Sequence, residues 1–323
     1  MHSPIENLDQ LLRDARGRER QLLFSVIAFL MRNVSNRKVR RCSHFVEWFR
    51  IPMNYARIME LPLTDILLDV KPDDRILDVS SPKLLAFLYG LKPKQRLVAA
   101  DLEEYFVGDF ETFMSETDLS LETNVFDASS KIPYPDESFD KVFSVSVLEH
   151  IADTGDGLAF DEIYRVLAPG GVAVITLPVY SEYLEEWTTN RSYWRTKQDN
   201  DNQKFFFQRR YDLAALEGRL RWNSEHKIEY VLVAENPIRP LELPEGGRLR
   251  HNSYLMDEQF VPRMLRKLGR VRYLPLLRYF AERWVSSSSH YLTTDWADPN
   301  IRQIVYKVTK PATNITAGHR VQA

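Results

Sequence analysis

Three aspartates associated with short apolar segments are the residues that first suggest chemistry. Asp78 lies in the run RILDV, Asp101 follows RLVAA, and Asp127 follows TNVF. If these segments are parallel strands, their carboxyl ends meet at one edge of a sheet, where ligands bind in open α/β folds. The 23 residues from Asp78 to Asp101 match the spacing at which an acid meets ribose hydroxyls. The sequence therefore favours a nucleoside ligand, with helix capping as the alternative role for any single acid.

Short β-branched segments alternate with helical stretches from residue 74 onward, and this order predicts a parallel sheet. Continuous apolar runs such as GVAVITL suit strands that helices cover on both faces. The predicted fold is therefore α/β, with a doubly wound, mostly parallel, seven-stranded sheet. The expected strands are 75–79, 96–100, 123–126, 141–145, 172–177, 226–234 and 301–309, with a helix over 211–220.

The chain divides into three predicted regions. Residues 1–70 show helical periodicity without strand alternation and are expected to form a helical N-terminal extension. Residues 71–310 hold the sheet, and within them 236–300 are expected to be a helical insertion before the last strand that forms a substrate or lid region. Residues 311–323 are predicted to be a flexible tail because their end lacks apolar periodicity.

Two longer segments carry a family resemblance. IPYPDESFDKVFSVSVLEHI at 132–151 precedes EIYRVLAPGGVAVITLP at 162–178. In order, spacing and residue type they resemble the fourth and fifth strand regions of class I S-adenosylmethionine-dependent methyltransferases with a simple seven-stranded core. The resemblance extends less specifically over 74–178. It implies a Rossmann-like fold, methyl transfer, and S-adenosylmethionine as the cofactor.

The resemblance also implies cofactor contacts for particular residues. Asp101 resembles the family's ribose-binding acid, and Leu102 stands beside it. Asp127 and Ala128 resemble its adenine contact, in which a carboxylate accepts from the exocyclic amine and a backbone N–H meets a ring nitrogen. Ser144, near the end of the predicted fourth strand, is also assigned to the cofactor.

The loop after the first strand departs from the family pattern. Where the family has Asp-x-Gly-x-Gly-x-Gly, residues 78–84 read DVSSPKL, so all three glycines are absent. Ser81 is a good helix N-cap, Pro82 suits the first helical position, and Lys83 stands in the first turn. A capped helix start with a lysine nearby can hold the carboxylate of the methionine end. A loop remodelled for structure alone is the alternative. The cofactor-binding prediction here covers Asp78, Ser80, Ser81 and Lys83.

Glu149 and His150 lie beyond the predicted fourth strand and are the candidate catalytic residues. Methyl transfer is an in-line displacement, and it needs a general base only when the acceptor must lose a proton. Histidine is the natural candidate because its ordinary pKa is near neutral. A structural role at a helix start is the alternative for this pair.

Composition limits the partners. The single cysteine, Cys42, excludes an internal disulfide and a Cys-based zinc site, and the scattered histidines offer no local metal site. The formal net charge is −2, and residues 101–162 hold 17 acidic side chains against two lysines, which disfavours nucleic acid. Residues 187–211 mix arginine with aromatic side chains, and we expect them to form a lid over a partly apolar acceptor.

We therefore expect a cytoplasmic S-adenosylmethionine-dependent methyltransferase of small-molecule biosynthesis. Its acceptor is expected to be a small-molecule or lipophilic compound methylated at oxygen, with carbon or nitrogen as alternatives. The basic amphipathic segment 266–284 is typical of a helix on anionic lipid, so peripheral membrane contact is a further expectation beside a plain solvated face. The rival hypothesis is a catalytically inactive, methyltransferase-like binding or scaffold subunit that pairs with an active partner through its N-terminal helices.

Overall fold

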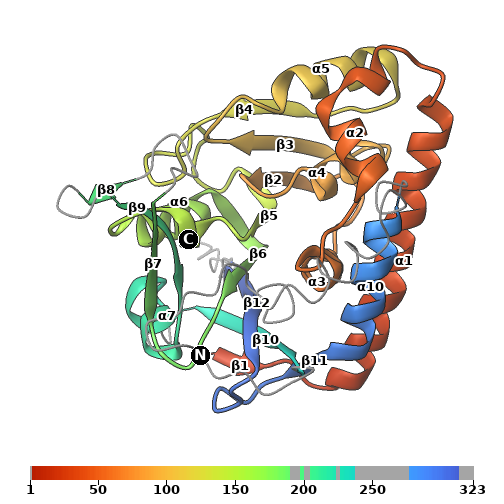
Figure 1. Ribbon diagram of the computed structural model, residues 1–323. Helices are drawn as coiled ribbons and strands as arrows, with labels where there is room; N and C mark the ends of the chain where they lie inside the picture. Colours follow the sequence, from red (N-terminus) through yellow and green to blue (C-terminus); the bar gives the residue numbers. More distant parts are fainter. Residues whose placement is uncertain (1, 190–196, 200–203, 223–225, 237–275, 313–323) are drawn as a thin grey trace, which may run out of the picture.

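The computed structural model describes residues 2–189, 197–199, 204–222, 226–236 and 276–312 (Figure 1). Its centre is a sheet of order β1-β10-β12-β6-β5-β2-β3-β4, in which β11 also pairs with β10. Strands β2 to β6 of this sheet run parallel to one another, which confirms the predicted α/β class. They are β2 (Arg75–Val79), β3 (Arg96–Asp101), β4 (Glu122–Val125), β5 (Phe139–Val145) and β6 (Leu167–Pro178).

The other end of the sheet holds the antiparallel pairs. β12 (Ile301–Thr309) runs antiparallel between β6 and β10 (Lys227–Glu235). Two strands beyond the predicted seven pair with β10, namely β1 (His2–Pro4) and β11 (His290–Thr293). The N-terminal region therefore contributes one strand, β1, that sequence analysis did not predict. Strands of three or four residues are too short to show an alternating pattern in a sequence.

Each face of the sheet carries its own apolar core. Along β2, Ile76 packs with the N-terminal helices, α4 and α5, whereas its neighbour Leu77 packs with α6 and α7. Leu97 and Val98 of β3 divide in the same way, because successive side chains of a strand point to opposite faces. The sheet is doubly wound, as predicted. The covering helices are α4 (Leu84–Gly90), α5 (Val107–Glu116), α6 (Gly155–Val166) and α7 (Leu213–Arg219).

The N-terminal helical region shares the core of α4 and α5, and its presence confirms that prediction. The rings of Phe29 and Trp48 each have their centroid 4.6 Å from that of Phe87 in α4. α3 is largely buried because it packs against α1 on one side and against β5, β6 and β12 on the other; Figure 1 shows it end-on beside the sheet. The helices of this region are α1 (Leu8–Asn33), a 3-10 turn (Val39–Arg41), α2 (Ser43–Arg50) and α3 (Arg57–Leu68).

The predicted insertion over 236–300 is described only at its two ends. In α10 (Leu277–Ser289), Tyr279 and Arg283 both contact Glu19 of α1. The described part of the insertion therefore packs on the N-terminal helices and continues into β11 at the sheet edge. Residues 237–275 and the predicted tail over 313–323 lie outside the described residues, so the lid and tail assignments stay predictions.

A second, antiparallel sheet stands beside the main one and has the order β7-β9-β8. It consists of β7 (Leu184–Thr188), β8 (Gln198–Asp199) and β9 (Lys204–Arg210), at the left of Figure 1. Sequence analysis did not predict these strands in the aromatic stretch 187–211. The helix predicted after them is α7, and the Asp212 side chain caps it by accepting from the Ala215 N–H at 2.7 Å.

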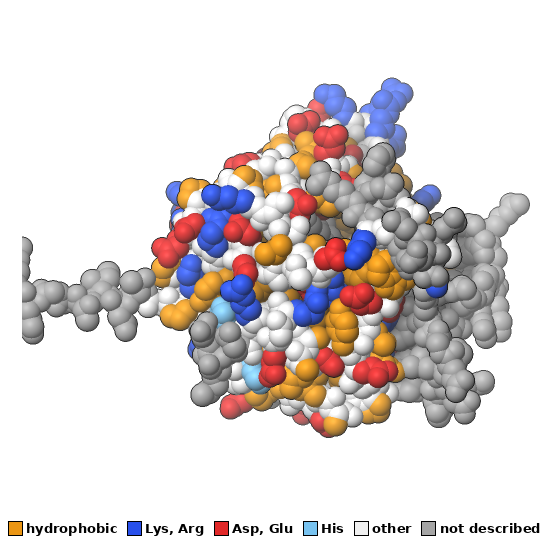
Figure 2. All heavy atoms as spheres, turned by 90° about the vertical axis from the view of Figure 1, so that its left-hand side faces the viewer, with side chains coloured by type: hydrophobic (Ala, Val, Ile, Leu, Met, Phe, Trp, Pro, Cys, Tyr) orange, Lys and Arg blue, Asp and Glu red, His pale blue; other side chains and the backbone are white. Residues whose placement is uncertain are grey.

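Figure 2 shows the molecule from the side of this second sheet. Basic and acidic side chains are interspersed over the coloured surface, with apolar side chains between them. A protein that binds nucleic acid is expected to gather Lys and Arg on one face or in one stripe. The described residues on this face therefore form no continuous basic surface.

Candidate active site

A cavity of about 540 Å³ lies at the carboxyl ends of the parallel strands. The chain places β3 and β4 on one side of β2 and then places β5 on the other side, so the strand order reverses here. Ligands of open α/β sheets bind at such a reversal. Six of the predicted site residues line the cavity, namely Ser80, Asp101, Leu102, Asp127, Ala128 and His150.

Asp101 ends β3 and faces the cavity with only 9% of its surface exposed. Its Oδ2 lies 3.2 Å from the Lys83 ammonium and accepts a hydrogen bond from the Tyr105 hydroxyl at 3.4 Å. Its Oδ1 accepts from the Glu103 N–H at 3.3 Å. Burial and the Asp101 charge together raise the pKa of Tyr105, so its hydroxyl stays protonated and donates. The carboxylate is thus held in one orientation.

Asp127 follows β4 on the far side of the same cavity. Its Oδ1 accepts from the backbone N–H of Ser129 at 2.9 Å and from the Ser129 hydroxyl at 2.6 Å. This local turn is a usual arrangement for an aspartate that precedes serine residues. Ala128 lies between them and also lines the cavity, so the predicted carboxylate and the backbone beside it are both at the site.

The glycine-free loop keeps an unusual backbone. Ser80 has φ +56°, the left-handed conformation that glycine adopts most readily, and its side chain lines the cavity. Ser81 is almost fully buried, and its hydroxyl oxygen accepts from the Val145 N–H at 2.9 Å. The prediction that Ser81 caps the following helix is therefore wrong: α4 begins after Lys83 without any side-chain cap. The hydroxyl is engaged by β5 instead.

Lys83 points away from the cavity and into the protein. Its ammonium lies 3.1 Å from Asp78 Oδ2 and 3.2 Å from Asp101 Oδ2, and its side chain is fully buried. It also donates to the carbonyl oxygens of Ser81 and Ala100, at 2.9 and 2.8 Å. Burial raises the pKa of Asp78 to about 6, and the Lys83 charge opposes that rise. Lys83 therefore does not present its charge to a ligand, contrary to expectation.

Five predicted site residues are buried and do not line the cavity, because their side chains are engaged inside the protein or enclosed by it. Ser144 donates to the Val79 carbonyl oxygen at 3.1 Å and so ties β5 to β2. Asp78 accepts from the Ser81 N–H at 2.9 Å, which fixes the loop after β2. The five residues are Asp78, Ser81, Lys83, Ser144 and Glu149.

His150 lies in a 3-10 turn (Leu148–His150) after β5 and lines the cavity. Its Nδ1 is 2.7 Å from the carbonyl oxygen of Phe207 in β9. A carbonyl oxygen only accepts hydrogen bonds, so Nδ1 carries the proton and Nε2 is the basic nitrogen of the neutral ring. Burial lowers the pKa of His150 to about 4, which keeps the ring neutral at physiological pH.

Glu149, the neighbour of His150, is a fully buried carboxyl group. Neither carboxyl oxygen has a hydrogen-bond partner among the described residues. Burial raises its pKa to about 8, and the nearby charge of Glu60 adds to the rise. Its Oε1 lies 3.8 Å from His150 Nε2, so the two predicted catalytic residues are adjacent although only His150 reaches the cavity.

Arg57 and Glu60 are functional candidates that sequence analysis missed. Arg57 is the first residue of α3 and lines the cavity, where its guanidinium pairs with Glu60. Glu60 is fully buried and also accepts from Ser146, from Thr176 at 2.6 Å, and from Gln303. Isolated charged residues in an apolar helix carry no local signal for such a site. Tyr105 and Ser146 also line the cavity unpredicted, and their positions just after strand ends were the available signal.

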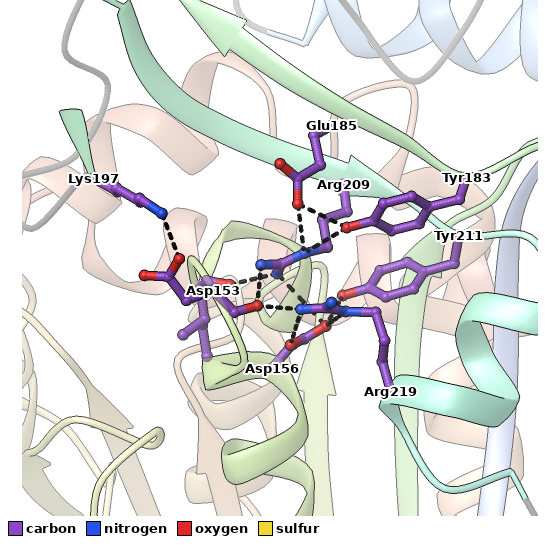
Figure 3. A network of polar contacts seen from close by, with 9 residues as sticks. Asp153, Asp156, Tyr183, Glu185, Lys197, Arg209, Tyr211 and Arg219 are labelled. Atoms are coloured by element: carbon purple, nitrogen blue, oxygen red, sulfur yellow. Dashed lines mark hydrogen bonds and ion pairs between the residues drawn. The ribbon is translucent and has the colours of Figure 1, made fainter. Parts of the chain in front are cut away.

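A network of polar contacts holds one wall of the cavity (Figure 3). Arg209 of β9 donates to the carbonyl oxygens of Ile151 and Asp153, the second at 2.7 Å. Buried Asp156 accepts from Arg219 Nε at 2.8 Å and from the Tyr211 hydroxyl at 2.9 Å. The second sheet and α7 thereby fix the segment that carries Ile151, which lines the cavity beside His150.

Two further observations concern ions and membranes. No group of three or more His, Cys, Asp or Glu side chains suited to a metal ion occurs among the described residues. Within the same part of the chain, no helix combines the length and the apolar character that crossing a membrane requires.

Comparison with known proteins concerns the same part of the chain that forms the parallel strands. Residues 79–175 match the family model of the methyltransferase domain, whereas no curated protein matches the sequence. Similar solved structures include the [4+2]-cyclase SpnF, with 15% identity, 77% of this chain and 80% of that chain covered, and a TM-score of 0.46. A putative methyltransferase of Bacillus halodurans shows 16% identity, 78% and 99% coverage, and a TM-score of 0.44.

A third similar structure is phosphoethanolamine N-methyltransferase 2 of Haemonchus contortus, with 20% identity, 78% of this chain and 52% of that chain covered, and a TM-score of 0.43. At such identities and TM-scores, these likenesses say nothing about the acceptor. The family match covers the loop after β2 and the strands β3 to β6 that surround the cavity, apart from the end of β6. The chain therefore contains a class I S-adenosylmethionine-dependent methyltransferase domain and is a methyltransferase that uses S-adenosylmethionine.

Proposed function

We propose that this methyltransferase methylates an oxygen of a small-molecule or lipophilic acceptor that binds beside His150. The observation that carries the proposal is the joint placement of Asp101, Asp127 and His150 around one cavity. The two acids follow β3 and β4, whereas the histidine follows β5 on the other side of β2. A nucleoside over the acids would leave its sulfur end, and an acceptor, toward His150.

The lining residues fit S-adenosylmethionine. The carboxylate of Asp101 faces the cavity in a fixed orientation and suits the two ribose hydroxyls. Asp127, oriented by Ser129, suits the exocyclic amine of adenine, and the backbone N–H of Ala128 suits a ring nitrogen. Glu103 adds a third carboxylate to the lining, which favours a ligand that carries positive charge.

The chemistry at the acceptor needs one proton to leave. S-adenosylmethionine, when bound, supplies a methyl group on a positively charged sulfur. A hydroxyl acceptor loses its proton as its oxygen forms the new bond, and Nε2 of His150 is placed to accept that proton. Glu149, 3.8 Å away, stabilises the resulting imidazolium when its carboxyl group is ionised.

The wall near His150 is apolar and suits a lipophilic acceptor. Val147, Ile151 and Ala152 line the cavity there, and the Phe207 ring packs edge-on against His150 with centroids 5.3 Å apart. Apolar walls with a few placed polar groups are typical of small-molecule sites. A cytoplasmic location with peripheral contact to anionic lipid belongs to the same proposal, supported by Phe280 and Trp284, which are exposed on α10 beside basic residues.

A methyl-transfer assay tests the proposal. Labelled S-adenosylmethionine is supplied with a panel of phenols, aliphatic alcohols and amines of graded apolar length. We expect transfer to a hydroxyl compound, with His150→Gln lowering the rate about 100-fold or more while the affinity for S-adenosylhomocysteine is unchanged. His2→Gln, in β1 at the far edge of the sheet, is the matched control and should retain the wild-type rate.

Two outcomes would overturn parts of the proposal. Transfer only to nitrogen, or a wild-type rate in His150→Gln, would remove the oxygen acceptor and the role of the histidine. If the wild-type protein binds neither S-adenosylmethionine nor S-adenosylhomocysteine at millimolar concentration, the binding or scaffold subunit replaces the enzyme.

A further inference from the structure

The charges that line the cavity are unequal. Three carboxylates line it, those of Asp101, Glu103 and Asp127, whereas Arg57 is the only Lys or Arg side chain among the described lining residues. The methionine end of the cofactor carries a carboxylate. In a cavity lined mainly by negative charge, this carboxylate requires hydrogen-bond donors or a cation. Among the described lining residues, Arg57 therefore offers the positive charge that the carboxylate requires.

The loop after β2 leaves few donors for this task. The N–H of Ser81 is already bonded to Asp78 at 2.9 Å, and Pro82, which lines the cavity, has no N–H. The ammonium of Lys83 is enclosed by two carboxylates and two carbonyl oxygens. The loop that replaces the three glycines thus directs its positive charge into the protein and away from the ligand.

The strand order gives the direction in which the ligand must run. With ribose at Asp101 after β3 and adenine at Asp127 after β4, the rest of the molecule crosses β2 toward β5. Ser146 follows β5 at that side and donates its hydroxyl to Glu60, which also binds Arg57. Arg57 therefore stands at the end of the path opposite the adenine.

We propose that Arg57, from the N-terminal helical region, binds the methionine carboxylate of S-adenosylmethionine. The inference rests on the proposed binding of the cofactor across Asp101 and Asp127. Arg57 suits this role because a guanidinium has five N–H donors in a planar fork, so a pair with Glu60 leaves others for a second carboxylate. α3 thereby becomes part of the cofactor site.

Glu60 acts as the positioning residue for Arg57. Its carboxylate accepts from Thr176 of β6 at 2.6 Å and from Gln303 of β12, as well as from Ser146. The guanidinium is thus anchored to two strands of the sheet and to the residue after a third, β5, through one buried carboxylate. A cation held in place before binding loses less entropy when the ligand arrives.

The test compares two ligands that differ at the methionine end. S-adenosylhomocysteine carries the amino-acid group, whereas 5′-methylthioadenosine has the same nucleoside without it. Isothermal titration should show that Arg57→Met weakens S-adenosylhomocysteine binding about 10- to 100-fold, which is typical for loss of a charged hydrogen-bond partner. Its affinity for 5′-methylthioadenosine should stay within about twofold of wild type. Arg57→Lys should weaken S-adenosylhomocysteine less than Arg57→Met.

Two control variants complete the design. Arg75→Met removes an arginine that pairs with Asp140 where β2 begins, at the opposite end of the strand, and should leave both affinities unchanged. Asp101→Asn should weaken both ligands, because both carry the ribose. Thermal melting of every variant confirms that it is folded before the titrations are compared.

The outcomes separate this inference from the proposed function. If wild-type protein binds S-adenosylhomocysteine and Arg57→Met binds it equally well, Arg57 does not hold the carboxylate, although the cofactor site stands. Equal weakening of both ligands in folded Arg57→Met also overturns the inference, because the effect would then be structural. Failure of the wild-type protein to bind either ligand overturns the proposed function itself.

Discussion

The ammonium of Lys83 lies 3.2 Å from Oδ2 of Asp101, so a residue of the glycine-free loop holds the acid that ends the next strand. The same ammonium is 3.1 Å from Asp78 Oδ2, and the side chains of Lys83 and Asp78 are fully buried. One buried cation therefore joins the ends of β2 and β3. The loop thereby orients Asp101, the acid that we propose binds the ribose.

Replacing Lys83 with methionine should cost both stability and binding. The buried Asp78 loses its ion-pair partner, and breaking such a pair lowers the free energy of unfolding by about 3–5 kcal/mol. Asp101 also loses its nearest cation, so S-adenosylhomocysteine should bind more weakly. Urea denaturation and calorimetry measure the two effects. A variant as stable as wild type would show that the buried pair does not hold the loop.

Ser80→Gly should stabilise the protein. Ser80 has φ +56°, and a residue other than glycine in this left-handed conformation carries a strain of about 1–2 kcal/mol. Replacement by glycine removes this strain, but glycine also has more conformational freedom in the unfolded chain, which cancels part of the gain. We expect the free energy of unfolding to rise by about 0.5–1 kcal/mol. Ser81→Gly is the matched control and should destabilise, because the Val145 N–H loses its buried acceptor. If Ser80→Gly lowers the free energy of unfolding, the backbone of Ser80 is not strained in the folded protein.

Glu149 should make the protein less stable as the pH rises. Burial holds the pKa of Glu149 at about 8, against 4.5 for an ordinary glutamate, so the folded state keeps a proton that the unfolded state has lost. The contribution of this group to stability is therefore complete below pH 4.5 and falls as the pH approaches 8. Glu149→Gln should raise the free energy of unfolding at pH 8 by about 2–4 kcal/mol and change it little at pH 4.

Urea unfolding of both proteins from pH 4 to 8.5 checks this prediction. The two curves should coincide at the acid end and separate as the pH increases. Curves that run parallel over the whole range would show that Glu149 ionises normally in the folded protein.

The contacts of Figure 3 predict a contrast between two cations in one network. Arg209 is fully buried, and Arg209→Met should destabilise by about 3 kcal/mol because Asp156 loses one of its cations and two carbonyl oxygens lose their donor. Lys197 pairs with Asp153 at the exposed edge. Lys197→Ala should therefore produce no measurable change in the free energy of unfolding. Chemical denaturation distinguishes the two. If the two variants lose equal free energy of unfolding, burial does not explain the larger contribution predicted for Arg209.

Most of the sheet was predictable because its central strands are covered on both faces and therefore appear as largely apolar runs. The predicted strand at 75–79 is β2, and the one at 301–309 is β12. β1 escaped because three residues make no pattern. β9 escaped because its arginines are buried through non-local partners, such as Asp156 for Arg209, which no local window reveals, and among the described strands β7 and β8 pair with β9 alone.

Residues that line the cavity could be predicted where they stand at strand ends. Where the direction of a side chain decides whether it lines the cavity, the sequence did not predict it. Asp101 and Asp127 line the cavity because each stands at or just beyond a strand end. Lys83 occupies the predicted loop, yet it turns inward, since two buried carboxylates attract it more strongly than an open cavity. Arg57 reaches the cavity from 44 positions before Asp101, through the packing of α3 on the sheet.

The most direct test of the cofactor site is a crystal structure of the wild-type protein with S-adenosylhomocysteine. The account predicts density for the ligand in the cavity at the carboxyl ends of β2, β3 and β5, with the ribose hydroxyls on the Asp101 carboxylate and the adenine amine beside Asp127. A ligand bound elsewhere, or a cavity without ligand density at saturating concentration, would contradict it.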